Sequence, residues 1–218
     1  MLEANLTLAQ REMAEGWYGY GHWRAPCWFI GMEPADDDID ACVRMWNALR
    51  REELLDITAY REPDDKDWFS REATKPQKTW EKLIWSILAY HKLAATPTSV
   101  LEYQKHKLGR QGGETALIEL SSIPARAITE VRPRMLYRQR RIDTLRLRLS
   151  DTVRFVVFYS DSEEYVNAWS AIAGTALRSG RPVLIGATAF AVMPHPQRER
   201  AKEPWLALGQ RLRELAPP

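Results

Sequence analysis

The stretch Pro26-Cys27-Trp28-Phe29-Ile30-Gly31 is a short, uninterrupted apolar run, and the chain continues from it into Met32-Glu33-Pro34. A strand with one face in water alternates apolar and polar residues, whereas a continuous apolar run of this length is typical of a strand buried on both faces. Strands of this kind lie inside parallel sheets that helices cover on both sides. The stretch therefore predicts the centre of an α/β fold.

Strands and helices alternate along the rest of the chain. Apolar runs predict further strands over Thr115–Leu120, Val153–Tyr159 and Thr188–Met193, and a short edge strand over Val183–Ile185. Helical spacing and capping residues predict helices over Leu6–Glu15, Asp36–Arg51, Gln77–Leu93, Thr98–Leu108, Met135–Leu149, Ser162–Gly174 and Lys202–Leu215. The aromatic, glycine-rich segment 16–23 predicts irregular structure. The alternation predicts a mostly parallel sheet with helices on both faces.

Length and composition exclude several classes of protein. The 218 residues, of which 45% are hydrophobic and 28% charged, suit one domain over residues 1–218 and argue against intrinsic disorder. No apolar run is long enough to span a bilayer, and the N-terminal residues lack the apolar core of a secretory signal, so we expect a cytoplasmic protein. Two cysteines and four scattered histidines give no metal-site spacing, so we expect no cofactor and no metal cluster.

The net charge of +2 conceals an uneven distribution of charge. Residues 33–67 hold twelve acidic and five basic side chains, whereas residues 124–148 hold eight arginines and only two acidic side chains. An arginine-rich stripe of this kind is a candidate phosphate-binding surface, and its alternative interpretation is a solvated helix face.

Two side chains at predicted strand ends are candidates for chemistry, because ligands in open α/β sheets bind beyond the carboxyl ends of the strands. Glu33 follows the first buried strand, where apolar walls would raise the pKa of its carboxyl and make it a general base. Its alternative role is a helix cap or a surface acid. His195 stands between Pro194 and Pro196 after the last strand, and the two prolines restrict the backbone that carries its side chain. An imidazole held in this way can donate a hydrogen bond to an oxygen that gains negative charge in a transition state. A structural histidine is the alternative.

Together, Gly31-Met32-Glu33-Pro34 and His195-Pro196 resemble the two signature motifs of the uracil-DNA glycosylase superfamily, which read Gly-x-Asp/Asn-Pro and His-Pro-Ser. The Gly-Met-x-Pro form is most similar to the single-strand-selective monofunctional branch. The resemblance implies a three-layer α/β/α sandwich around a four-stranded, mostly parallel sheet. It also implies that Glu33 positions or activates the water that attacks C1′ of a flipped nucleotide, and that His195 stabilises the departing base anion.

The same resemblance assigns further residues to the site. Met32 and Pro34 flank the motif carboxylate and are expected to contact the substrate. The family stacks a phenylalanine on the base thirteen residues after the motif carboxylate or amide, and in this sequence that spacing reaches Trp46. Trp46 also fits the apolar stripe of its predicted helix, so a place in the core is the alternative.

The chain departs from the family pattern at three places. Glu33 is one methylene longer than the Asp or Asn of the family motif. The family reads the base with an asparagine after the second strand, but here that region holds Glu119 and Ser121 and no amide. Glu119 could accept a hydrogen bond from a ring N–H of the base. The serine of the late motif is missing. The predicted nucleic-acid contacts are Ser160, Gln197, Arg198 and Arg200, of which the two arginines could equally be surface charge.

Three functions remain open from the sequence. The first is a DNA glycosylase-like enzyme, most simply a monomer, that excises a deaminated or damaged base from DNA. The second is a catalytically inactive module of the same fold that binds nucleic acid or nucleotides. The third is an N-glycosidic hydrolase acting on a free nucleoside or nucleotide, for which the acidic segment near Glu33 would be less repulsive than for DNA.

Overall fold

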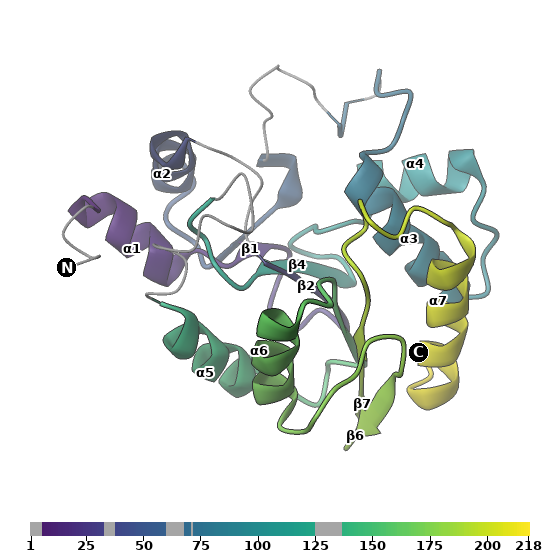
Figure 1. Cartoon of the computed structure of the whole chain (residues 1–218). Coiled ribbons are helices and arrows are strands. Elements are labelled where there is room, and N and C mark those ends of the chain that lie inside the picture. Colours follow the sequence, from purple (N-terminus) through teal and green to yellow (C-terminus); the bar gives the residue numbers. More distant parts are fainter. Residues whose placement is uncertain (1–5, 33–37, 60–67, 71, 125–136) are drawn as a thin grey trace.

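Helices and strands alternate throughout the computed structural model, which describes residues 6–32, 38–59, 68–70, 72–124 and 137–218 (Figure 1). The elements are α1 (Leu8–Gly16), β1 (Gly19–Tyr20), β2 (Cys27–Gly31), α2 (Ile39–Ala48), β3 (Leu54–Leu55), the 3₁₀ turn η2 (Ile57–Ala59), α3 (Lys78–Tyr90), α4 (Pro97–His106), β4 (Thr115–Glu119), α5 (Arg138–Arg148), β5 (Phe155–Phe158), α6 (Glu163–Ala173), β6 (Val183–Ile185), β7 (Thr188–Val192) and α7 (Glu203–Leu215). The α/β class predicted from the sequence is confirmed.

The sheet has the order β3-β1-β4-β2-β5-β7-β6. Its four central strands, β4, β2, β5 and β7, are mutually parallel, and β6 forms the predicted edge strand, antiparallel to β7. The prediction of a four-stranded sheet is wrong, because the described part of the chain forms a sheet of seven strands, with antiparallel pairs outside the parallel centre.

The two strands that the sequence did not predict, β1 and β3, have two residues each, too short for a periodic pattern. β1 lies in the segment expected to be irregular and pairs antiparallel with β4. Gly19 permits this pairing: its φ is 134°, and a Cβ there would lie 2.1 Å from the Leu117 carbonyl oxygen. Only glycine adopts this conformation at so close an approach without strain.

Alternate residues of the central strands enter two separate cores, one on each face of the sheet. Phe29 and Val157 point to the face covered by α3 and α7, whereas Trp28 and Val156 point to the face covered by α5 and α6. All four are fully buried, and burying one such side chain contributes roughly 1.5–3 kcal/mol. Helices therefore cover both faces, as Figure 1 shows for α3 and α7 on one side and α5 and α6 on the other.

A buried arginine joins three elements at the end of β4. The Arg141 guanidinium of α5 donates to the carbonyl oxygens of Leu120 (2.7 Å), Glu119 (2.8 Å), Ala14 (3.0 Å) and Trp17 (3.0 Å). It also lies 3.9 Å from the centre of the Tyr18 ring. Burial lowers the pKa of Arg141 to about 10, so it remains charged at neutral pH. These contacts fix the end of α1 and the end of β4 to α5.

We expect Arg141→Met to lower the free energy of unfolding by about 3 kcal/mol or more, because the exchange leaves four buried carbonyl oxygens without their donor. Urea denaturation followed by circular dichroism measures the change. Arg146→Met, an exposed position on the same helix, is the matched control and should leave the midpoint unchanged. Equal midpoints for both variants would contradict this role of Arg141.

Candidate functional site

The carboxyl ends of the four parallel strands bring together the segments that the sequence singled out. Beyond the strands, the Ser121 N–H donates to the Met32 carbonyl (2.8 Å), and the Tyr159 N–H donates to the Ile30 carbonyl (3.1 Å). The Met193 N–H donates to the Phe158 carbonyl (2.8 Å) in the same way. The segments that follow β2, β4, β5 and β7 therefore lie side by side at one edge of the sheet.

Tyr159 occupies the middle of this edge. Its hydroxyl lies 3.4 Å from Oε1 of Glu119, and its ring centre lies 6.1 Å from that of His195. Gly31 makes room for the ring, since a Cβ on Gly31 would lie 2.3 Å from the Tyr159 hydroxyl oxygen. The structure thus places an aromatic ring between a carboxylate and an imidazole.

Sequence reasoning missed Tyr159 as a site residue because it ends an apolar run and was assigned to a buried strand. The available signal was its position directly before Ser160, a predicted nucleic-acid contact at the end of a predicted strand.

His195 is held in one orientation by its own loop. Its carbonyl oxygen accepts from the N–H groups of Arg198 (2.8 Å) and Glu199 (3.0 Å), and its Nδ1 accepts from the Gln197 N–H (3.3 Å). A ring nitrogen that accepts carries no proton, so the neutral ring has its proton on Nε2. Burial, and then the charge of Arg198, lower the pKa of His195, which favours this neutral form. His195 is thereby prepared to donate one hydrogen bond from Nε2.

Other predicted site residues have structural contacts. The Ser121 hydroxyl accepts from the Ile123 N–H (3.2 Å) within its own turn, and the buried Ser160 accepts the Trp169 indole N–H on its carbonyl oxygen (2.8 Å). Met32 is half-buried against the core on the α5 and α6 face. These contacts position the edge of the sheet.

Trp46 is only 4% exposed and belongs to the core. Its indole donates to the Glu52 carbonyl oxygen (2.9 Å), and its ring packs so closely on Gly16 that a Cβ there would lie 2.8 Å away. The structure favours the core interpretation of Trp46 over base stacking. Asp38 caps the helix that carries Trp46, since its side chain accepts from the Ala41 N–H (2.9 Å).

The remaining predictions divide between exposed residues and residues that are not described. Gln197, Arg198 and Arg200 are exposed on the loop after His195. Arg198 pairs with Asp161 (3.1 Å), and Arg200 donates from Nε to the Gln197 carbonyl oxygen (3.0 Å). Glu33 and Pro34 lie outside the described residues, so their predicted roles stay predictions.

The arginine-rich stripe is largely engaged within the chain. Besides the buried Arg141, Arg138 pairs with Glu164 (2.6 Å), Arg140 with Glu15 (2.9 Å) and Arg148 with Glu53 (2.7 Å). Among the described arginines of the stripe, these four hold α5 to its neighbours. This arrangement weakens its interpretation as a phosphate-binding surface.

No described group of three or more His, Cys, Asp or Glu side chains could hold a metal ion. No helix within the described ranges is long and apolar enough to cross a membrane. A scan of protein-family models finds no match to the chain, and a search of curated proteins finds no similar sequence. The resemblance to the uracil-DNA glycosylase superfamily therefore rests on the motifs.

We expect Gly31→Ala to destabilise the fold by about 1–3 kcal/mol, because the new methyl group overlaps the Tyr159 ring. The same exchange in a Tyr159→Ala background should cost much less, whereas a Tyr159→Phe background retains the ring and the full penalty. Denaturant unfolding of the six proteins measures the coupling. An equal penalty in all three backgrounds would show that Tyr159 does not restrict position 31.

We expect the His195 imidazole to titrate below its ordinary pKa of about 6.5. Arg198→Gln should raise that pKa, because it removes a positive charge that opposes protonation of the ring. Nuclear magnetic resonance of the ring protons across pH 4–9 (roughly the range around the ordinary value) follows both titrations. An unchanged His195 pKa in the variant would contradict the electrostatic influence of Arg198.

Proposed function

We propose that the protein hydrolyses the N-glycosidic bond of a nucleobase in a polynucleotide, as a DNA glycosylase-like enzyme, at the carboxyl edge of the sheet. The observation that carries the proposal is the neutral His195 imidazole, mounted between two prolines with its proton on Nε2. Its surroundings, a half-buried edge with Tyr159 beside it, strengthen a hydrogen bond to a developing anion because water competes poorly there.

In the proposed reaction the bond between C1′ and the base nitrogen breaks, and its electron pair leaves with the base. The resulting base anion accepts a hydrogen bond from Nε2–H of His195. A neutral donor suits this task, because it supports the anion without having to transfer its proton. Water adds to C1′, and its proton passes to a carboxylate, the role that the resemblance gives to Glu33.

Glu119 and Tyr159 supply a second polar wall of the site. A carboxylate can only accept when ionised, so Glu119 would bind a base through a ring or exocyclic N–H. Tyr159 contacts the same carboxylate and offers its ring beside His195. The pair would orient the base so that its oxygen meets Nε2.

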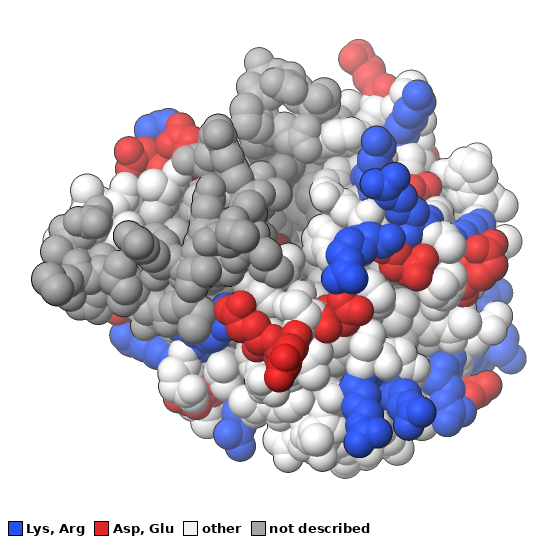
Figure 2. Space-filling model, viewed as in Figure 1, with Lys and Arg blue, Asp and Glu red and all other residues white. Residues whose placement is uncertain are grey.

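A second candidate is hydrolysis of a free nucleoside or nucleotide. The intramolecular ion pairs of Arg138, Arg140 and Arg148 favour it, because they leave fewer α5 cations for a phosphate backbone. Figure 2 also shows acidic side chains gathered beside the region that is drawn grey. The two candidates share their chemistry and differ in the size of the substrate.

We expect abasic product from at least one oligonucleotide containing uracil, hypoxanthine or xanthine, tested single- and double-stranded. His195→Ala should lower the rate by about 100-fold or more, the usual loss when one donor to a developing anion is removed. His106→Ala, which changes an exposed histidine on α4, is the control and should retain activity. Alkaline strand cleavage and electrophoresis measure the abasic product.

Release of free base from deoxyuridine or deoxyinosine, without product from any oligonucleotide, would establish the second candidate instead. Absence of product from all of these substrates would refute glycosidic hydrolysis.

A further inference from the structure

A groove lies between the end of α3, the loop that follows it and α7, and we call it the α3–α7 groove. Its volume is about 840 Å³. Its apolar wall is formed by Ala89, Leu93, Ala94, Ala95 and Leu206. Figure 1 shows α3 and α7 side by side on one face of the sheet. Grooves of this size with apolar walls and a few polar groups are typical binding sites for small molecules.

The two helices that form the groove are fixed to each other by the fold. Gly209 lets α7 approach α3 closely, since a Cβ there would lie 2.1 Å from the Ser86 carbonyl oxygen. The Tyr90 hydroxyl donates to the Ala216 carbonyl (2.7 Å), which joins the ends of the two helices. A ligand therefore does not have to order these walls when it binds.

Lys92 ends α3 in a conformation that lysine rarely adopts. The Leu93 N–H donates to the Leu88 carbonyl (2.8 Å) and the Lys92 N–H donates to the Ala89 carbonyl (3.1 Å), the two hydrogen bonds of a Schellman motif. Lys92 occupies the left-handed position of this motif, with a φ of 58°. Glycine is usual there, because a side chain is strained in this conformation. The strain indicates that the lysine side chain has a task besides ending the helix.

The positive charges of the groove lie toward the end of α7. Arg213 lines the groove and donates to the carbonyl of Tyr90, two residues before Lys92 (3.4 Å). Lys92 also lines the groove, is exposed, and makes no ion pair with any residue that the structure describes. Glu214 lines this end too, but it is paired with Arg211 (2.6 Å). This end of the groove therefore offers two cations to an anionic group.

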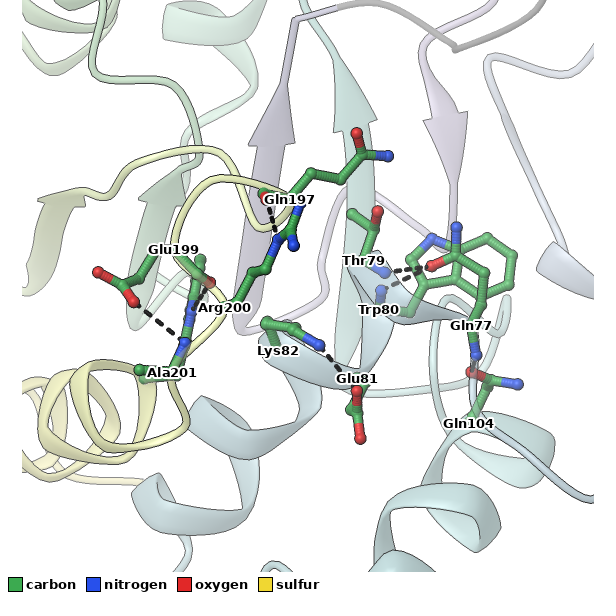
Figure 3. Close-up of polar contacts among 11 residues, drawn as sticks. Gln77, Thr79, Trp80, Glu81, Lys82, Gln104, Gln197, Glu199, Arg200 and Ala201 are labelled. Carbon is green, nitrogen blue, oxygen red and sulfur yellow. Dashed lines mark hydrogen bonds and ion pairs between the residues drawn. The ribbon is translucent and has the colours of Figure 1, made fainter.

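The lysines toward the start of α7 are engaged within the fold. Lys82 pairs with Glu81 (2.8 Å), as Figure 3 shows, and Lys202 donates to the Ala95 carbonyl. Both ammonium groups also lie over the Trp85 ring, 4.8 Å and 5.8 Å from its centre. The groove is therefore asymmetric, with apolar side chains toward the start of α7 and available cations toward its end.

We propose that the α3–α7 groove binds an aliphatic carboxylate, such as a fatty acid. The carboxylate lies on Lys92 and Arg213, and the chain lies along Leu93 and Leu206. From Leu206 to Arg213 α7 makes about two turns, roughly 10 Å, a distance that a medium-length aliphatic chain spans. The chain covers Leu93, which is 54% exposed, and the burial of its methylenes supplies affinity. This proposal does not depend on the proposed function.

Isothermal titration calorimetry of the full chain with monomeric decanoate tests the proposal. We expect one binding site per chain. Octanoate should bind about five- to fifteenfold more weakly, because it buries two fewer methylenes. Decyltrimethylammonium has a chain of the same length and the opposite charge, so it should show no measurable binding. Equal affinities for the two decyl compounds would overturn the assignment of an anionic ligand.

The left-handed conformation of Lys92 allows a variant that removes the cation without straining the fold. Lys92→Gly should weaken decanoate binding about three- to tenfold, the loss of one exposed charged contact. Its melting temperature should stay the same or rise, because glycine suits the position. Arg50→Gly is the matched control: it removes an exposed arginine, with a φ of 62°, after α2 and should leave binding unchanged. An unchanged affinity in Lys92→Gly would contradict the role of Lys92.

A second variant tests the apolar wall. Ala94→Glu places a carboxylate at an exposed position of the wall and should weaken decanoate binding about tenfold or more by repulsion. Ala171→Glu, at an exposed position of α6, is its control and should retain the affinity. Circular dichroism establishes that each variant is folded.

Two further outcomes would overturn the proposal: no binding of decanoate, or binding that Ala94→Glu leaves unaffected. A second copy of the chain is the rival occupant of the groove. Analytical ultracentrifugation that detects a dimer which decanoate does not dissociate, and which Ala94→Glu does, would assign the groove to that dimer instead. Each of these failures leaves the proposed function untested and intact, since the groove shares no described residue with the carboxyl edge of the sheet.

Discussion

The backbone pairing of β2 with β4 on one side and β5 on the other, continued by the pairing of β5 with β7, aligns the described strand ends of the candidate site. Because these strands are parallel, their carboxyl ends meet at one edge, and the loops that leave them must converge there. The pairing is stable because β2 is buried on both faces. Gly31, its last residue, admits the Tyr159 ring between Glu119 and His195. The same strand pairing therefore determines both the packing of the sheet and the position of Tyr159 near Glu119 and His195.

An arginine-rich helix can bind phosphate groups or stabilise the fold through internal contacts, and most of the described arginines of α5 make internal contacts. Arg141 stabilises the junction of α1, β4 and α5 through four carbonyl oxygens, a role that requires full burial of the charge. Its described neighbours on the stripe, except Arg146, pair with acidic side chains of other elements. Other exposed cations lie elsewhere on the chain, Lys75 and Lys78 just before and at the start of α3 and Arg200 on the loop after His195. The net charge near zero therefore does not reveal which charged side chains pair within the fold and which are exposed.

Local patterns predicted much of this fold. The apolar runs of β2, β4, β5 and β7, and the helical spacing of α3 and α7, are long enough for the period of the side chains to identify each element. The two-residue strands β1 and β3 could not be predicted, because they exist only through pairing with each other and with β4. The rule that ligands bind beyond the carboxyl ends of strands likewise located the segments of Glu119 and His195. It did not identify Tyr159, because that residue ends an apolar run typical of a strand and only the fold shows that it lies beside His195.

The sequence by itself determined the alternation of strands and helices, the parallel centre of the sheet and the rigid proline mount of His195, since each follows from local periodicity or from covalent constraint. Only the tertiary structure decided which ring accompanies His195, which arginines are engaged and where aromatic and basic side chains meet. The reason is physical: hydrogen bonds such as that of Gln77 to Gln104, and ring contacts such as that of Phe69 with Trp80, join residues whose separation along the chain carries no signal of their proximity.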